Sequence, residues 1–151
     1  MLTKETERNE NSQTGTDGTI TGIRLTISSY NLIQSNTLAV TAPAISIGDE
    51  SNYNQIIENT FSAERGSFGV SLHDSYFNTI SDNVLDNFGT GLQLGGAENN
   101  TISWNIVTSR ERALQLSRFN NNTFQGNQFR GATEIWDLGA EYGNPSINIW
   151  K

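Results

Sequence analysis

The sequence predicts an all-β protein that winds into one parallel β-helix (a β-solenoid) of about five regular coils followed by a degenerate sixth. The first reason is a pair of asparagine rows that recur every 22–24 residues. The second is an alternating apolar pair ahead of each asparagine frame, such as "GLQL" at 91–94. The third is that the repeat contains short period-two runs and no helical periodicity. The two rows are Asn31, Asn54, Asn78, Asn100 and Asn122, then Asn36, Asn59, Asn83, Asn105 and Asn127.

Each regular coil is expected to bury four apolar side chains in a narrow core. Coils of a parallel solenoid lie about 4.8 Å apart, so equivalent residues form rows along the axis. Two rows precede the asparagine frame, Ile23/Ile45/Val70/Leu92/Leu114 and Leu25/Ile47/Leu72/Leu94/Leu116. The other two are Ile33/Ile56/Ile80/Ile102/Phe124 and Leu38/Phe61/Leu85/Val107/Phe129.

The asparagines are expected at the corners of the coils. Asparagine tolerates a left-handed backbone, and its amide can hydrogen-bond to the asparagine one coil above or below. This pairing would satisfy polar groups that a buried corner otherwise leaves unpaired. We therefore interpret both rows as scaffold rather than as a substrate site.

The two ends of the chain depart from the repeat. Residues 1–18 are polar and are expected to form an N-terminal arm or cap, and residues 19–151 the β-helix domain. In the degenerate sixth coil, Trp136, Asp137 and Leu138 fall 22 residues after Leu114, Gln115 and Leu116. Asn144 has the same spacing from Asn122. Because unpaired strand edges at a solenoid end favour association, a homo-oligomer through the coil ends is an open expectation.

Composition excludes several partners and kinds of site. A net charge of −7 and a pI near 4.5 argue against nucleic acid, because a polyanion would be repelled. The absence of cysteine excludes disulfides and thiolate chemistry. No apolar run approaches the roughly 18 residues that membrane insertion requires, and the first residues do not have the pattern of a signal peptide.

The repeats resemble those of right-handed parallel β-helix proteins in the pectate-lyase-like superfamily. The matching pattern is G-I-x-L followed by N-x-I-x-x-N-x-I, over residues 19–138. It is similar to the repeat of polysaccharide lyases, mannuronan epimerases, phage tailspikes and periplasmic copper-binding accessory proteins. The resemblance implies a right-handed coil and, in the lyases and epimerases, catalytic groups on the outward row between the apolar pair. That row here is expected to be Arg24, Ser46, Ser71, Gln93, Gln115 and Asp137.

Candidate catalytic and metal-binding groups are few. His73 is the only histidine and precedes Asp74, so a His–Asp base is conceivable, although a surface turn is the favoured interpretation. Asp49 and Asp74 should stack in consecutive coils, with Glu50 and Glu98 on the same edge, as oxygen ligands for a Ca²⁺ ion. The alternative is a solvated acidic edge, and no other cofactor is expected.

Candidate binding residues are aromatic or basic. Trp104 stands in a row with Ser35, Glu58, Asp82 and Gly126, so we expect it on the outside. Arg65, Arg110, Arg112 and Arg130 are expected in the loops that close the coils, where ion pairs with Glu64 and Glu111 are favoured over a groove for an acidic glycan. Four further aromatic residues could stack on sugar rings or pack their own loops: Tyr76, Phe77, Phe88 and Phe119.

The function expected from these features is that of a non-catalytic structural or carbohydrate-binding module, in an extracellular, cell-surface or virion setting. Its partner would be a polysaccharide. The first alternative is a polysaccharide lyase or uronan epimerase, or a fragment of one, acting on acidic glycans. The second is a self-assembling β-solenoid.

Overall fold

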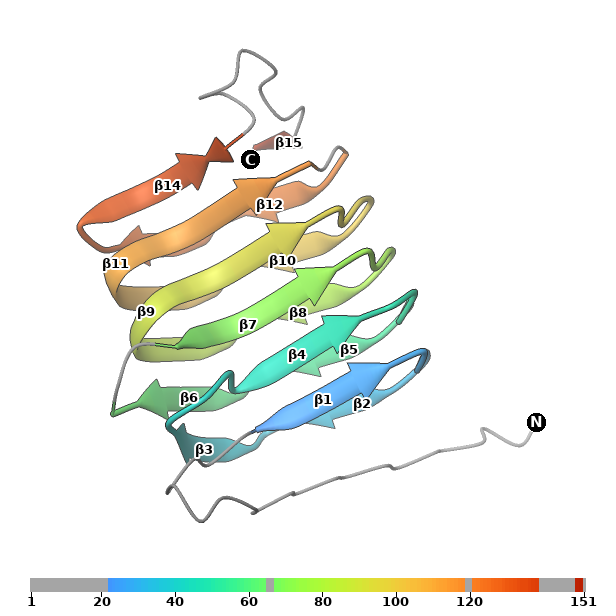
Figure 1. The fold of residues 1–151 in the computed structure, drawn as a ribbon, viewed down its shortest axis with the longest axis horizontal. Coiled ribbons are helices and arrows are strands. Elements are labelled where there is room, and N and C mark those ends of the chain that lie inside the picture. Colours follow the sequence, from blue (N-terminus) through green and yellow to red (C-terminus); the bar gives the residue numbers. More distant parts are fainter. Residues whose placement is uncertain (1–21, 65–66, 119–120, 139–148, 151) are drawn as a thin grey trace.

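The computed structural model describes residues 22–64, 67–118, 121–138 and 149–150, and all of its strands pair in parallel. The chain climbs one coil at a time from β1 at one end to β14 and β15 at the other (Figure 1). The strands are β1 (Ile23–Thr26), β2 (Leu32–Gln34), β3 (Thr37–Val40), β4 (Ile45–Gly48), β5 (Gln55–Ile57), β6 (Thr60–Ala63), β7 (Phe68–His73), β8 (Thr79–Ser81), β9 (Val84–Gly95), β10 (Thr101–Ser103), β11 (Ile106–Ser117), β12 (Thr123–Gln125), β13 (Gln128–Arg130), β14 (Thr133–Asp137) and β15 (Ile149–Trp150).

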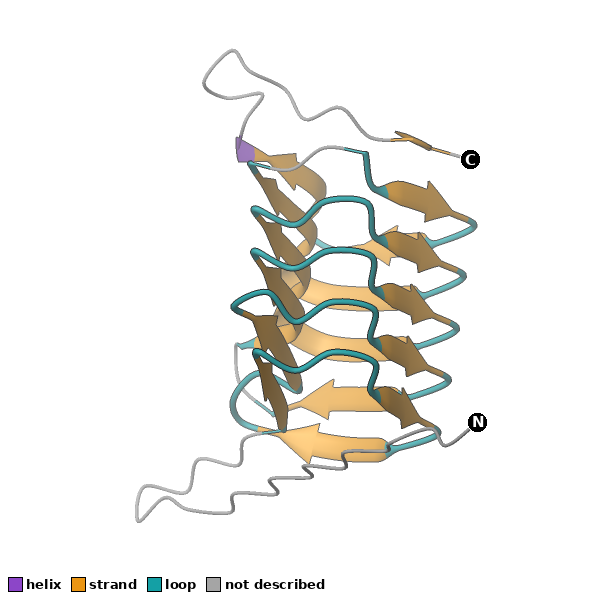
Figure 2. Ribbon diagram, turned by 90° about the vertical axis from the view of Figure 1, so that its right-hand side faces the viewer, coloured by secondary structure: helices purple, strands orange, loops and turns teal. Residues whose placement is uncertain are grey.

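These strands form three stacks around the core (Figure 2). The short strands β2, β5, β8, β10, β12 and β15 make one sheet. A larger sheet supplies the other two stacks, because the 12-residue strands β9 and β11 run through both of them. One of these stacks contains β1, β4, β7 and β14, and the other β3, β6 and β13.

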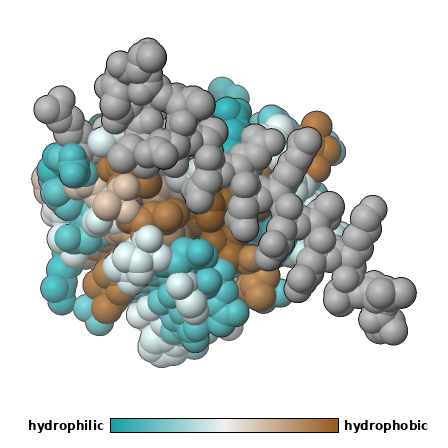
Figure 3. All heavy atoms as spheres, turned by 90° about the horizontal axis from the view of Figure 1, so that it is seen from below, coloured by the Kyte–Doolittle hydropathy of each residue, from teal (hydrophilic) through white to brown (hydrophobic). Residues whose placement is uncertain are grey.

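The four predicted core rows are confirmed in register. Ile45 pairs with Ile23 and Val70, Ile56 with Ile33 and Ile80, and the other two rows follow in the same way. All of their side chains are buried except Ile23, Leu38 and Phe129, which lie in the first and last regular coils and are partly buried. Seen from the first-coil end, hydrophobic side chains lie between hydrophilic ones (Figure 3). Burial of these rows is the main driving force for stacking the coils.

Both asparagine ladders are present. The side-chain amide of each asparagine in the first four regular coils donates to Oδ1 of the asparagine in the next coil, as from Asn54 to Asn78 at 3.1 Å and from Asn83 to Asn105 at 2.9 Å. The backbone N–H donates to the same oxygen, at 2.8 and 3.0 Å for these two pairs. A second amide hydrogen bond turns inward to a backbone carbonyl, from Asn83 to Ile56 for example. The ladders therefore satisfy backbone groups at the corners, as expected.

The expectation that the ladder asparagines are themselves left-handed is wrong. The residue before each of them has the positive φ, at 65° for Tyr30 before Asn31 and 58° for Trp104 before Asn105. The turn is thus made one position earlier. This leaves the asparagine free to point its amide along the solenoid axis.

The register of the sixth coil also differs from the prediction. Ile135, Trp136 and Asp137 pair with Leu114, Gln115 and Leu116. The regular spacing had predicted Trp136, Asp137 and Leu138 as the partners of those three residues, so the register differs by one residue. The outward row therefore ends at Trp136 rather than Asp137. Ile149 pairs with Thr123, and Trp150 stacks on Phe124 with ring centroids 4.5 Å apart, which extends the third core row. Asn144 and the N-terminal residues 1–18 lie outside the described residues.

Candidate functional site

The outer surface of the short-strand sheet is lined by neutral side chains. Strands β5, β8, β10 and β12 pair residue for residue, so their outward side chains form straight rows. We call this surface the short-strand face. It carries one row of Leu32, Gln55, Thr79, Thr101 and Thr123 and a second row of Gln34, Ile57, Ser81, Ser103 and Gln125.

An exposed aromatic stack borders the face on one side. Tyr30 stacks on Tyr53, and Tyr53 on Phe77, each with ring centroids 5.1 Å apart and ring planes within 7° of parallel. The three side chains are 77%, 45% and 48% exposed. We call this row the aromatic corner; its members precede the first asparagine ladder and are Tyr30, Tyr53, Phe77, Asn99 and Asn121.

Trp104 borders the face on the opposite side and is 57% exposed, so the prediction that it lies outside is confirmed. A Cβ built on Gly126 would lie 2.3 Å from Cε3 of Trp104, so the indole occupies space that a side chain in the next coil would need. We call its row the Trp104 corner. Its members are Ser35, Glu58, Asp82, Trp104 and Gly126. The backbone N–H of each of the first four donates to the carbonyl of the residue that precedes the next member.

The aromatic residues at both corners have a backbone that bulky side chains seldom adopt. Tyr53, Phe77 and Trp104 each have φ of 58°, a region that favours glycine and asparagine. Other coils place Asn99, Asn121 and Gly126 at the equivalent positions. Left-handed backbone at a bulky residue costs on the order of 1 kcal/mol and often marks a functional position. The exposed aromatics are therefore candidates for contact with a partner.

Replacing Phe77 with asparagine tests whether this aromatic side chain serves stability. We expect the free energy of unfolding to change by no more than about 1 kcal/mol, because relief of the left-handed backbone offsets the lost ring stack. Urea unfolding followed by circular dichroism measures the change. A loss of several kcal/mol would show instead that the aromatic stack is mainly a structural element.

On the stack that contains β1, β4, β7 and β14, outward side chains contact neighbouring residues of the protein. The Ser71 hydroxyl donates to Gln93 Oε1 at 3.0 Å. The Arg112 guanidinium lies 3.7 Å from the centroid of the Trp136 ring and donates to Gln115 Oε1 at 3.5 Å. A cation stacked on an aromatic ring in this way is partly withdrawn from other partners.

Two of the four candidate arginines lie in a strand rather than in the predicted loop. Arg110 and Arg112 belong to β11, because bulges after Thr108 and Ser109 carry that strand through the expected loop. Within the described part of the chain, no ion pair joins either of them to Glu111. Arg130 lies at the end of β13 and donates to Gln128 Oε1 at 3.1 Å, while Arg65 lies outside the described residues.

His73 and Asp74 lie over glycines of the next coil and do not contact each other through a hydrogen bond. A Cβ built on Gly95 would lie 2.8 Å from His73 Nδ1, and one on Gly96 would lie 2.1 Å from Asp74 Oδ1. Both residues are exposed, and Asp74 has a φ of 44°. This arrangement fits a surface turn.

The predicted calcium ligands gather only in part: Asp49 and Asp74 stack as predicted, whereas Glu98 lies elsewhere in its coil. Asp49 and Asp74 follow the paired residues Ile47 and Leu72 by two positions and so occupy equivalent corners. Glu98 instead bridges to Tyr76, two positions beyond Asp74 in the coil. The residues that the structure describes contain no group of three His, Asp or Glu side chains arranged to hold a metal ion. Calcium binding stays a prediction without a ligand set.

The comparison with known families decides the assignment of the fold. The model of a family described as a right-handed β-helix region matches residues 9–146. The chain belongs to the right-handed β-helix family. Comparisons with curated proteins and with solved structures found no match. Membership of the β-helix family establishes the handedness that the coil spacing alone left open, and it does not by itself specify an activity.

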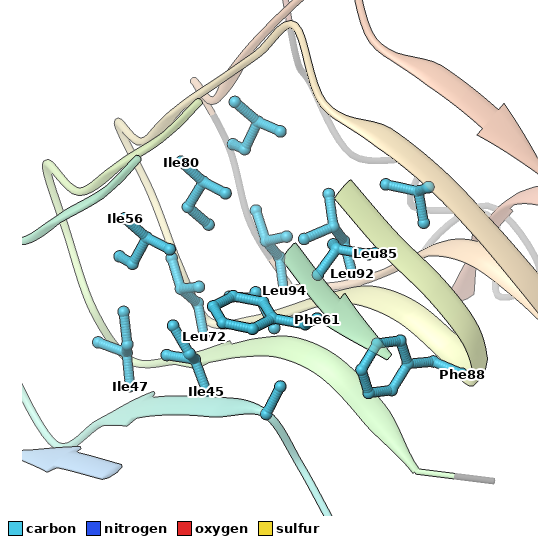
Figure 4. Packing of buried hydrophobic residues seen from close by; sticks show 14 of the residues in the cluster. Ile45, Ile47, Ile56, Phe61, Leu72, Ile80, Leu85, Phe88, Leu92 and Leu94 are labelled. Carbon is cyan, nitrogen blue, oxygen red and sulfur yellow. The ribbon is translucent and has the colours of Figure 1, made fainter. Parts of the chain in front are cut away.

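The remaining aromatic candidates of this β-helix separate into different environments. Tyr76 is half-buried, and its backbone N–H donates to Asn52 Oδ1 at 2.7 Å. Phe88 is fully buried, so its proposed role as an exposed stacking group is wrong; Figure 4 shows it among core side chains. Phe119 lies outside the described residues. Among the described residues, no helix has the length and apolar character needed to cross a membrane.

Sequence reasoning missed Tyr30 and Tyr53 as members of the exposed stack. Both stand one position before the first asparagine ladder, as Phe77 does. Aligning that position across the coils would have revealed the row, because coil register brings equivalent residues together.

Proposed function

We propose that this β-helix is a non-catalytic module that binds polysaccharide across the short-strand face and its two corners. The observation that carries the proposal is the position of Trp104, a largely exposed indole held at a left-handed corner beside rows of hydroxyl and amide side chains. Sugar rings offer an apolar face to aromatic groups and hydroxyls to polar ones. Sites for such ligands combine aromatic surface with a few placed polar groups.

Trp104 is the better anchor of the two aromatic features. The faces of Tyr53 are covered by Tyr30 on one side and Phe77 on the other. Trp104 has no aromatic neighbour in its row, where Asp82 and Gly126 flank it. The indole lies close over Gly126, so a sugar ring can stack on the side of the indole that is turned away from Gly126. The aromatic corner offers ring edges along the opposite border of the face.

The experiment is to replace Trp104 with alanine and measure polysaccharide binding by titration calorimetry. We expect affinity to fall at least about tenfold, because an exposed tryptophan at the centre of a contact commonly contributes more than 1 kcal/mol. Ile106→Ala is the matched control, since it removes another exposed apolar side chain of the same coil from a neighbouring strand. Equal affinity of the Trp104 and Ile106 variants would contradict the proposal.

The same preparation distinguishes the other functions that the sequence left open. Release of unsaturated uronide from alginate or pectin, lost in His73→Ala, would replace the binding proposal with a lyase. Light scattering that shows an oligomer forming through the coil ends would support self-assembly. The proposal also includes an extracellular, cell-surface or virion setting, where such a module would meet its polysaccharide.

A further inference from the structure

In the five coils from β2 to β12, the short-strand face and its two corners carry carboxylates and no cation. Every residue of the four rows in these coils is described, and none is lysine or arginine. The only charged side chains among them are those of Glu58 and Asp82, both in the Trp104 corner. The other side chains are hydroxyls, amides, aromatics and a few aliphatic groups.

The two carboxylates differ in their surroundings. Glu58 Oε2 accepts hydrogen bonds from Gln34 Nε2 at 3.0 Å and from the Ser35 hydroxyl at 3.4 Å. Neutral donors of the face thus already engage this carboxylate. Asp82 is exposed, and no side chain in the described part of the protein donates to its carboxylate. Asp82 therefore has acceptor capacity left for a ligand.

Asp82 stands directly beside Trp104. The Asp82 N–H donates to the Ser103 carbonyl at 3.1 Å, and the Trp104 N–H to the Gln125 carbonyl at 2.9 Å. The two residues thus occupy the same position in neighbouring coils, which lie about 4.8 Å apart. A sugar ring stacked on the indole would bring its hydroxyls within reach of this carboxylate. A carboxylate with two acceptor oxygens suits a pair of neighbouring hydroxyls.

From this arrangement we infer that the polysaccharide bound by the short-strand face is uncharged, and that the Asp82 carboxylate orients it by accepting hydrogen bonds from its hydroxyls. The inference rests on the proposed function and specifies the ligand class for that site. A polyuronate would meet two carboxylates and no neutralising cation, on a protein whose net charge is −7. The described arginines that could pair with uronates stand on other surfaces, in β1, β11 and β13 and directly after β11.

A cationic glycan is the less suitable ligand for the same surface. A cationic glycan would depend on carboxylates. Glu58 already accepts hydrogen bonds from Gln34 and Ser35, so Asp82 is the single carboxylate of the face without a side-chain donor. The rest of the face is neutral, and hydrogen bonding between neutral groups and hydroxyls is insensitive to ionic screening. Salt dependence therefore separates the two ligand classes.

The test is titration calorimetry of the full chain with polymers of three charge classes. Hydroxyethyl cellulose, galactomannan and dextran are the uncharged probes, polygalacturonate and alginate the acidic ones, and glycol chitosan the cationic one. We expect an uncharged polymer to bind at least about tenfold more tightly than either charged class. Its affinity should change by less than about threefold between about 50 and 500 mM NaCl, because screening acts on charged ligands.

The Asp82→Asn variant tests the orienting role. Asparagine tolerates the φ of 57° at this position, so the fold is preserved. We expect affinity for the uncharged polymer to fall about tenfold, since hydrogen bonds to a charged acceptor are stronger than those to an amide. Asp86→Asn is the matched control, because it makes the same charge change on an exposed residue of β9 outside the face. That variant should bind within about twofold of the unchanged protein.

Two results would overturn the inference while leaving the proposed function intact. One is tighter binding of an acidic or cationic polymer that still depends on Trp104, and the other is unchanged affinity in Asp82→Asn. Binding of none of the polymers, or binding that ignores Trp104, would remove the proposed function itself.

Discussion

Replacing Asn105 with alanine is expected to lower the free energy of unfolding by about 3–5 kcal/mol, a large share of the stability of a domain of this size. Asn105 is fully buried. Its Oδ1 accepts from the backbone and side chain of Asn83, and its amide donates to the Ile80 carbonyl at 2.9 Å. Alanine leaves these groups buried without partners, and each such group costs about 1–3 kcal/mol. Urea unfolding followed by circular dichroism measures the loss.

Two further variants show whether the ladder causes this loss. Asn127→Ala removes a half-buried member in the last regular coil and should cost less, because its side chain lies nearer solvent. Thr101→Ala removes an exposed side chain of the same coil as Asn105 and should change stability by less than about 0.5 kcal/mol. A small effect of Asn105→Ala, comparable to that of Thr101→Ala, would mean that water replaces the lost amide at the corner.

The sequence was sufficient to predict the fold because the contacts of a solenoid repeat. A side chain such as Ile56 packs between its equivalents Ile33 and Ile80, so periodicity in the chain directly predicts pairing in space. The prediction failed in the sixth coil, where Ile135 takes the register position opposite Leu114 that the spacing gave to Trp136. One residue of shift exchanges the two faces of a strand, and a coil without regular neighbours on both sides has no second register to correct it.

The left-handed corners were misassigned for a chemical reason. Asparagine is suited both to a left-handed backbone and to an amide ladder, so one residue was given both roles. The structure divides them between neighbours, and the left-handed position accepts Tyr30, Glu58 and Trp104 as well as glycine. Stacking and hydrogen bonds between coils hold these residues in the left-handed backbone conformation. Such contacts cannot be predicted from the conformational preferences of the residue types.

The candidate site was only partly predictable. Trp104 was identified because it is the only aromatic residue at its position in the repeat, and the repeat determines where that position lies in the coil. Arg110 and Arg112 were misplaced because bulges extend β11 through a segment that is irregular in sequence. No periodic signal marks a bulge, since its residues have no equivalents in the other coils.

Phe88 lies beside these bulges, where it pairs with Ser109 of β11, and its replacement by alanine is the second large expected effect. Asn87, with a φ of 62°, turns the chain so that the Phe88 ring enters the core, where it is fully buried. We expect Phe88→Ala to lower the free energy of unfolding by about 3–5 kcal/mol, the usual cost of removing a buried phenylalanine and leaving a cavity. The urea concentration at the midpoint of unfolding measures this loss, provided that the variant and the unchanged protein unfold with the same dependence on urea.

Phe77→Ala provides the matched comparison for Phe88→Ala, because it removes the same side chain from the exposed aromatic corner. Its cost should stay near 1 kcal/mol, since a side chain that is 48% exposed loses little burial on truncation. Phe88→Leu should recover most of the loss, because leucine refills much of the cavity. Equal costs for the two alanine variants would contradict the burial of Phe88. A difference of several-fold would show that the position of an aromatic residue relative to the coil, rather than its type, separates the scaffold from the surface available to a partner.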